Sequence, residues 1–386
     1  MKKVLYLIAL ISLISCSNNQ KKNSSKEPKK NKEIQVKVNP NIETIGIILN
    51  LSELGDFVLK QSNENKNYEF IRLIRKHFKK FKNHQAVVNF NELNKLDLAH
   101  SGHYYYGITF SELPEFNMIY PRYNEFYSSE KFNKQEVDSI LTNFDTSIKK
   151  FYKEAEVGEF LNENHGIYNA ITSEIKSSLP ENLLPIMEKY FKNYKNNYTI
   201  VPSISIPVNW SFGTDLKSNN GVTYNYLTGP YHDLKIKINN LSEISDKDSL
   251  GFGDKKAILD LAIHEFGHSF IRYIDKKKNI KLYESLSYLN NEQLKKNFER
   301  IGEGTEWSTV FEEHLVRANE IMIWKEMANE KMANEKLEYE YNKEGISYIK
   351  EFVNSLENYR IHKDEYENFE DYFPKLITDL KNINKQ

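Results

Sequence analysis

Residues 258–271 contain two histidines whose spacing suits the binding of a metal ion. His264 and His268 lie four positions apart, and Glu265 directly follows the first of them. Four residues of an α-helix turn through about 400°, so both imidazoles would point the same way, one turn apart. Two neutral imidazoles can supply two ligands of one zinc ion, and the neighbouring glutamate can accept a proton from an activated water molecule. The spacing therefore predicts metal-assisted hydrolysis with Glu265 as the general base.

A catalytic zinc ion needs a third protein ligand, and residues 307–322 are the best source. This segment has the apolar spacing of a helix. Helical geometry places Glu312 about 100° and Glu313 about 160° from the centre of the apolar stripe, so periodicity alone leaves both carboxylates open as the ligand. Arg317 follows Glu313 by one turn and could hold that carboxylate in place. His314, at the margin of the stripe, is an alternative third ligand or else a buried, hydrogen-bonded histidine.

No motif marks the group that would stabilise negative charge on a reacting carbonyl oxygen. Tyr231, His232 and Arg317 are the candidates. His100 and His103 stand in a glycine-containing stretch that predicts a turn, and no carboxylate or thiol accompanies them. A second metal site there is therefore the less favoured interpretation.

The motif and the later glutamates together resemble known metallopeptidases. The stretch H-E-F-G-H at 264–268 resembles the zincins, and a later helix with a glutamate resembles their gluzincin branch, in which two histidines and one downstream glutamate hold zinc. No histidine follows His268 at the spacing of the metzincin branch.

A narrower resemblance covers residues 38 to about 380. It is to a domain-of-unknown-function family of secreted, gluzincin-like bacterial lipoproteins, and it rests on three stretches: N-H-Q-A-V at 83–87, H-E-F-G-H-S-F at 264–270 and E-H-L-V-R-A at 313–318. In that pattern the expected metal ligand of the last stretch is Glu313. The resemblance thus implies a zinc site of His264, His268 and Glu313.

The elements around these residues predict an α+β protein, mostly helical, with a small mixed or antiparallel sheet next to the HExxH helix. We expect a helical region at 38–197 and a zincin-like catalytic region with C-terminal helices at 198–386. Helical periodicity is found in four stretches of the first region: 41–60, 68–82, 84–98 and 134–195.

The predicted strands come directly before the HExxH helix. Residues 198–212 alternate and are rich in Ile and Val, while Pro202 and Pro207 confine such a strand to a sheet edge or a bulge. Zincins bind extended substrate along an edge strand, so this segment is the expected substrate-binding edge, with a purely structural hairpin as the alternative. Two further strands are predicted at 223–227 and 234–238.

The HExxH helix itself is predicted over residues 254–275, with Asp254 as its N-cap. Gly267 lies in its middle, where glycine costs about 1 kcal/mol relative to alanine. This cost predicts that another backbone packs closely there. Further along, M-A-N-E-K occurs twice, at 327–331 and 332–336, which predicts a local duplication in an exposed helix.

The start of the chain has the pattern of a bacterial lipoprotein signal. A basic pair precedes an apolar run at 4–14 that is too short to span a bilayer but typical of a signal peptide. The sequence L-I-S-C at 13–16 resembles a lipobox, in which Cys16 becomes lipidated. We expect a signal peptide at 1–15, a flexible tether at 16–37, and a location in the bacterial cell envelope, facing outside the cytoplasm.

Composition and motifs together favour a zinc-dependent hydrolase. With 53 basic and 54 acidic residues the net charge is −1, which gives no overall attraction to nucleic acid. The predicted partners are a peptide or protein substrate and the membrane, reached through Cys16. The favoured activity is peptidase. The alternatives are a non-catalytic surface-binding lipoprotein on a zincin fold and a zinc amidase acting on cell-wall material.

Overall fold

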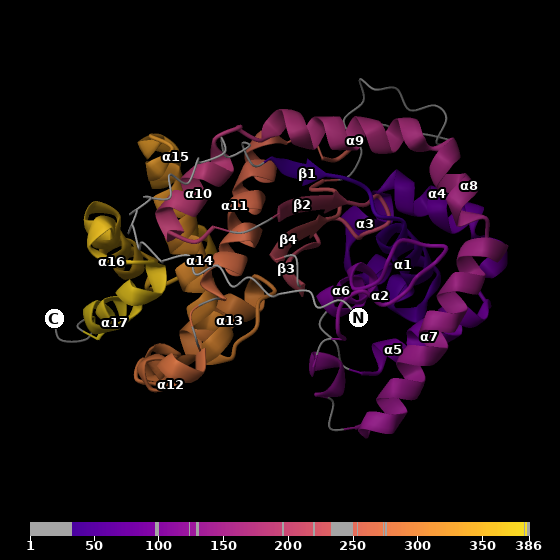
Figure 1. Ribbon diagram of the computed structural model, residues 1–386, viewed down its shortest axis with the longest axis horizontal. Coiled ribbons are helices and arrows are strands. Elements are labelled where there is room, and N and C mark those ends of the chain that lie inside the picture. Colours follow the sequence, from indigo (N-terminus) through magenta and orange to yellow (C-terminus); the bar gives the residue numbers. More distant parts are fainter. Residues whose placement is uncertain are drawn as a thin grey trace, which may run out of the picture. The chain divides into compact units, whose positions relative to one another are not determined.

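The computed structural model confirms the α+β class, because its many helices surround one small mixed sheet (Figure 1). It describes residues 33–383 except 97–99, 123, 129–130, 195–196, 219–220, 233–249, 253, 273, 275 and 382. The predicted signal peptide, Cys16 and the strand predicted at 234–238 lie outside the described residues. In the part of the chain that is described, no helix is both long and apolar enough to span a membrane.

The helical prediction for the first half of the chain holds, although caps divide the helices into shorter pieces. Ser52 both ends α1 and begins α2, because its backbone N–H donates to Leu49 O and its hydroxyl accepts from Gly55 N. The helices of this half are α1 (Pro40–Leu51), α2 (Glu53–Gln61), α3 (Asn63–Asn67), α4 (Glu69–His77), α5 (Gln85–Asn94), α6 (His100–Ile108), α7 (Lys134–Glu154), α8 (Val157–Glu163), α9 (His165–Ser178) and α10 (Leu183–Phe191). The turn predicted around His100 and His103 is wrong, since both residues belong to α6.

The sheet has four strands: β1 (Ile34–Val36), β2 (Asn197–Pro202), β3 (Ser211–Ser218) and β4 (Gly221–Thr228). Their order is β1-β2-β4-β3, and β3 alone runs antiparallel to its neighbour. Residues 34–36, near the end of the predicted tether (16–37), form strand β1. The strand predicted at 223–227 is confirmed as β4.

The single strand predicted at 198–212 is wrong, because the chain bends after Pro202 and returns as β3. Ile204, Ile206 and Val208 in the bend are all buried, so the alternation of apolar residues continues where the strand does not. As a result β2 lies inside the sheet, and the edge strand near the HExxH motif is β3.

Helix α11 (Lys255–Ile271) carries the HExxH motif and is buried on nearly all sides. Asp254 is its N-cap, as predicted, and accepts from the backbone N–H groups of Lys256 and Ala257. The helix packs against β3 and β4 on one side and against α14 (Trp307–Glu326) on the other. The Phe266 ring meets Tyr198 of β2 edge-on at 5.5 Å. This contact turns Phe266 toward the sheet, and the two histidines of the motif face α14.

The remaining helices form the C-terminal part of the chain (Figure 1). They are α12 (Lys276–Glu284), α13 (Glu292–Arg300), α15 (Glu330–Tyr339), α16 (Ile349–His362) and α17 (Phe369–Leu380), with a short π-helical turn, η5 (Glu340–Glu344), after α15. They bury α14, and Phe311, Leu315 and Met322 of its apolar stripe belong to the core. Glu313 is also buried, at 5% exposure, which the apolar stripe did not predict.

Candidate metal centre

Helices α11 and α14 bring His264, His268 and Glu313 together into a group that can hold a metal ion. One potential ligand atom from each residue lies within 4.8 Å of the other two. His268 Nε2 is 3.2 Å from His264 Nε2 and 3.2 Å from Glu313 Oε1, and His264 Nε2 is 3.7 Å from Glu313 Oε2. Ligands about 2.1 Å from a tetrahedral zinc ion lie roughly 3.4 Å apart. The three separations therefore fit one such ion.

A carboxylate holds the far nitrogen of each imidazole. His264 Nδ1 is 2.6 Å from Glu320 Oε1, and His268 Nδ1 is 3.2 Å from Glu312 Oε1. A carboxylate at Nδ1 fixes the ring and its tautomer, so that Nε2 is presented to the metal. The structure thus places Glu313 among the candidate ligands and Glu312 behind one of them.

Two largely, though not fully, buried cations stabilise the carboxylates of this centre. Arg317 Nε donates to Glu313 Oε2 at 3.3 Å, as expected from their spacing, and its other nitrogens pair with Glu340 and Glu303. Lys336 Nζ lies 2.9 Å from Glu320 Oε2 and 3.0 Å from Glu340 Oε1. Because Arg317 stands behind Glu313 with its guanidinium engaged by three carboxylates, its alternative role in stabilising an oxyanion is not supported.

The electrostatics of the centre favour a cation. Burial alone would lower the pKa of His268, but the Glu313 and Glu312 carboxylates outweigh burial and raise that pKa to about 10. Burial would raise the pKa of Glu313, yet His268, His264 and Arg317 hold it far below its ordinary value. The carboxylates thus stabilise positive charge at the two imidazoles. A bound divalent ion would provide this positive charge in place of the protons on the imidazoles.

Glu265 lies beside the edge strand β3. It is 7% exposed, and a Cβ built on Gly213 would lie 2.6 Å from Glu265 O and 2.9 Å from its Oε2. Only glycine allows the strand to approach the helix so closely. The carbonyl oxygen of Gly213 accepts from Tyr105 Oη at 2.6 Å and from Arg272 Nη1 at 3.0 Å.

Of the other oxyanion candidates, Tyr231 has the more suitable surroundings. Burial raises its pKa to about 12, with Glu265 adding to the rise, so its hydroxyl keeps its proton at neutral pH. That hydroxyl lies 3.0 Å from the hydroxyl of Tyr226. His232 instead lies near Glu174 of α9. Burial raises the pKa of that carboxyl, and the backbone N–H of Leu250 and His232 offset only part of the rise.

The other histidines considered as metal ligands do not join the group. His314 Nδ1 lies 2.7 Å from Val310 O, and its ring stacks on Phe298 at 5.5 Å. Burial lowers the pKa of His314 to about 4, so it is the buried, hydrogen-bonded histidine rather than the third ligand. His103 is buried in α6 with its ring 4.8 Å from Phe90. Among the described residues, the one potential metal-binding group is His264, His268 and Glu313.

Sequence patterns missed several residues of this centre. Glu320 follows Glu313 by two helical turns, so helical periodicity places both carboxylates on one face, and this spacing is the signal that could have found Glu320. Lys336 belongs to the second M-A-N-E-K copy, and its side chain is only 16% exposed where the repeat predicts an exposed helix. Gly213, Tyr105 and Arg272 come from three distant segments, and no local signal connects them.

Comparison with known proteins identifies the family of the chain. A family model described as Domain of unknown function (DUF4932) matches residues 34–379, so the chain belongs to that family. No curated protein and no solved structure matches the chain.

Proposed function

We propose that this member of the DUF4932 family is a zinc-dependent hydrolase that cleaves peptide bonds. The observation that carries the proposal is the convergence of His264, His268 and Glu313, with Glu265 next to them on the same helix. Two imidazoles and one carboxylate match the three-ligand set of catalytic zinc sites, which leave a fourth position open. Structural zinc sites rely on cysteine, and the only cysteine of this chain is Cys16.

When bound, zinc acts as a Lewis acid and lowers the pKa of a water molecule to about 7. In the proposed reaction Glu265 takes the proton of the attacking water and passes it to the leaving amine. Tyr231 is the group we assign to donate a hydrogen bond to the oxygen of the attacked carbonyl. Glu320, Glu312 and Arg317 hold the ligands in place.

The proposed substrate is an extended peptide that lies along β3. This strand forms the edge of the sheet and carries Gly213 against Glu265. Peptides add to exposed sheet edges through main-chain hydrogen bonds. The antiparallel pairing of β3 with β4 leaves the backbone groups of alternate β3 residues directed away from the sheet.

The same proposal places the protein in the bacterial cell envelope, outside the cytoplasm, with a lipid on Cys16 as its membrane anchor. The support is the lipobox-like L-I-S-C and the polar segment that follows it. A Cys16→Ser variant should move from the membrane fraction to the soluble or unprocessed fraction. Membrane retention of a processed Cys16→Ser protein would contradict the anchor.

Metal analysis of purified variants tests the ligand set. We expect about one zinc per chain in the wild type and in Glu312→Ala at saturating zinc, because Glu312 only supports His268. Glu313→Ala should lose the metal. Loss of zinc in Glu312→Ala but not in Glu313→Ala would reverse the assignment.

Activity assays with peptide pools and with peptidoglycan test the reaction. We expect the wild type to cleave peptides, and Glu265→Gln to bind zinc with activity reduced at least a hundredfold, the typical minimum contribution of general-base catalysis. Cleavage of peptidoglycan amide bonds alone would make the enzyme an amidase. Full activity in Glu265→Gln would exclude Glu265 as the base.

A further inference from the structure

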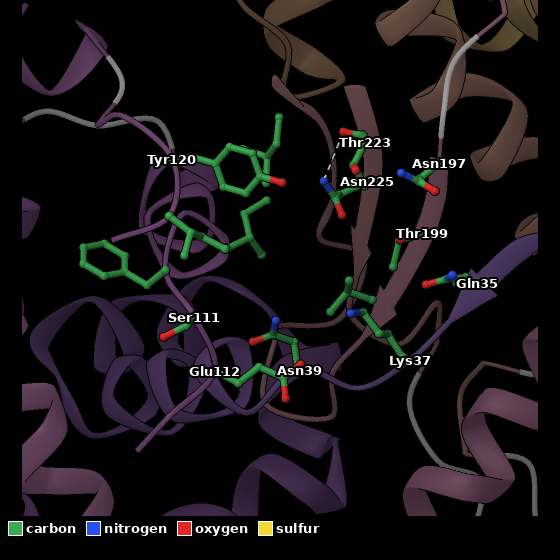
Figure 2. Close-up of a pocket in the computed structure, with 15 residues that line it drawn as sticks. Gln35, Lys37, Asn39, Ser111, Glu112, Tyr120, Asn197, Thr199, Thr223 and Asn225 are labelled. Atoms are coloured by element: carbon green, nitrogen blue, oxygen red, sulfur yellow. Dashed lines mark hydrogen bonds between the residues drawn. The ribbon is translucent and has the colours of Figure 1, made fainter. Parts of the chain in front are cut away.

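A cavity of about 370 Å³ lies against one face of the sheet (Figure 2). Side chains alternate between the two faces of a strand, so Tyr198 and Ile200 of β2 face one way while Asn197 and Thr199 face the other. Tyr198 contacts Phe266 of α11, whereas Asn197 and Thr199 line the cavity. The cavity is therefore separate from the metal centre.

The floor of the cavity is a row of amides and hydroxyls that crosses three strands. Gln35 of β1 is in register with Thr199 of β2, which is in register with Asn225 of β4. A second pair, Asn197 and Thr223, lies beside them in the same register. The other face of this sheet is packed with tyrosines, so the polar row is a local feature and not the general composition of the sheet.

Three of the polar side chains are nearly buried and still direct hydrogen-bonding groups into the cavity. Thr199 is 4% exposed, Asn225 7% and Asn39 9%. No described residue forms a hydrogen bond with the Thr199 side chain or with Asn39 Nδ2. Asn39 Oδ1 caps α1 by accepting from Asn41 N and Ile42 N, which orients its amide. These polar groups open onto the cavity, where water or a polar ligand can form their hydrogen bonds.

The opposite wall is apolar and firmly held. Figure 2 shows Tyr120 across the cavity from Thr223 and Asn225. The lining also includes the apolar side chains of Ile108, Phe110 and Ile119, from the same part of the chain as Tyr120. Asn41 fixes this segment, because its Nδ2 donates to Gly107 O and Ser111 O and its Oδ1 accepts from Leu113 N. Tyr120 N donates to Thr109 O. The wall is thus in place before any ligand arrives.

We propose that this cavity binds a neutral saccharide. Amides and hydroxyls can both donate and accept, which matches sugar hydroxyls, and the wall of Tyr120 and aliphatic groups suits the apolar face of a sugar ring. Among the described residues of the lining, the charged side chains are Lys37 and Glu112, which have opposite charges. These residues therefore give the site no net charge that would select an anion or a cation. The proposal does not depend on the metal centre.

Ligand-observed NMR and calorimetric titration of the purified protein test the proposal. The probes are glucose, galactose, mannose, N-acetylglucosamine, N-acetylgalactosamine and disaccharides of these sugars. We expect saturable binding of at least one probe. Thr199→Val keeps the shape and strand preference of the side chain but removes its hydroxyl, and Asn225→Ala removes one amide. Each should weaken binding about tenfold, as loss of a hydrogen bond in a buried site does.

Asn169→Ala, at an exposed position of α9, is the matched control and should bind as the wild type does. Zinc content and thermal unfolding show that each variant is folded. Absence of binding across the panel overturns the proposal, as does binding that Thr199→Val and Asn225→Ala both leave unchanged. Binding of peptides in the cavity without binding of any sugar also overturns it.

Discussion

Two glycines close to Glu265 differ in their tolerance of a side chain. A Cβ at Gly267 would meet only Val316 Cγ1, at 3.5 Å, which is ordinary van der Waals contact. The expectation of a close backbone neighbour at Gly267 is therefore wrong. At Gly213 a Cβ would come within 2.6 Å of the backbone of Glu265.

Gly267→Ala should raise the free energy of unfolding by about 0.5–1 kcal/mol, because alanine is the better helix former and the space exists. Gly213→Ala should lower it by about 1–3 kcal/mol, because strand and helix must separate. Urea unfolding measures both. Gly267→Ala should still bind zinc. Loss of zinc binding in this variant would show that the glycine has a role in the metal site itself.

Glu43 gives the protein a pH-dependent stability away from the metal centre. The residue is fully buried, and burial outweighs its hydrogen bonds to Ser203, Ser205 and Tyr168, so its pKa rises from 4.5 to about 7. Between about pH 4.5 and 7 the unfolded chain is ionised at this carboxyl while the folded chain is not. The contribution of Glu43 to the free energy of unfolding is therefore lost as pH rises through this window, and it does not change further above the window.

Glu43→Gln removes the ionisation and keeps the shape. The difference in free energy of unfolding, variant minus wild type, should be about 3 kcal/mol larger at pH 8 than at pH 4.5. This figure follows from 1.36 kcal/mol for each unit of pKa shift. Urea unfolding at the two pH values, with zinc present, gives the difference. An equal effect of the substitution at both pH values would contradict the raised pKa.

At the scale of elements, α15 reaches the metal centre through one lysine. Lys336 pairs with Glu320, which holds His264. Lys336→Met leaves Glu320 and Glu340 without that cation, so the affinity for zinc should fall about 10- to 100-fold, as on loss of other groups that support a ligand. Competition with a chromogenic chelator measures the dissociation constant.

The repeat supplies a matched control. Lys331 occupies the same place in the first copy, but its side chain is 85% exposed. Lys331→Met should leave zinc affinity unchanged, and Lys336→Arg should restore most of what Lys336→Met loses. Equal zinc affinities of Lys336→Met and the wild type would show that α15 does not support the metal site.

The elements that sequence patterns predicted well have local signals. Helix α11 has its cap at Asp254 and its histidines one turn apart, and α14 has a continuous apolar stripe. Local signals failed where tertiary packing decides. The bend between β2 and β3 is buried like a strand, and Glu313 is buried by Arg317 and by helices far along the chain.

At the scale of the whole molecule, the metal centre joins α11, next to the sheet, to α14, among the C-terminal helices. An ion that binds only the folded protein stabilises it by an amount that grows with its concentration. At zinc concentrations about a hundredfold above the dissociation constant, the gain should be about 2.7 kcal/mol.

Thermal unfolding tests this linkage. The midpoint should fall by several degrees with a chelator, recover with added zinc, and keep rising with zinc concentration. Glu313→Ala should show no zinc dependence. If neither the chelator nor added zinc changes the unfolding midpoint of the wild type, no ion binds in the folded state.

Long-range pairings were the least predictable feature of the molecule. Ile34–Val36 lies within the predicted tether, yet it pairs in parallel with β2 more than 160 residues away. Three residues are too few to show a periodicity that would predict this strand. Likewise, the polar row from Gln35 through Thr199 to Asn225 exists only once these strands are in register.

The M-A-N-E-K repeat adopts two conformations in the same chain. Ala328 of the first copy has φ +57° at the corner between α14 and α15, while Ala333 of the second lies within α15. An allele that lost one unit would still encode the corner, since the units are identical, but Lys336 would vanish and everything after it would rotate by about 140°. Such an allele would lack the contact between Lys336 and Glu320. The number of M-A-N-E-K units in close relatives would therefore show whether that contact is kept.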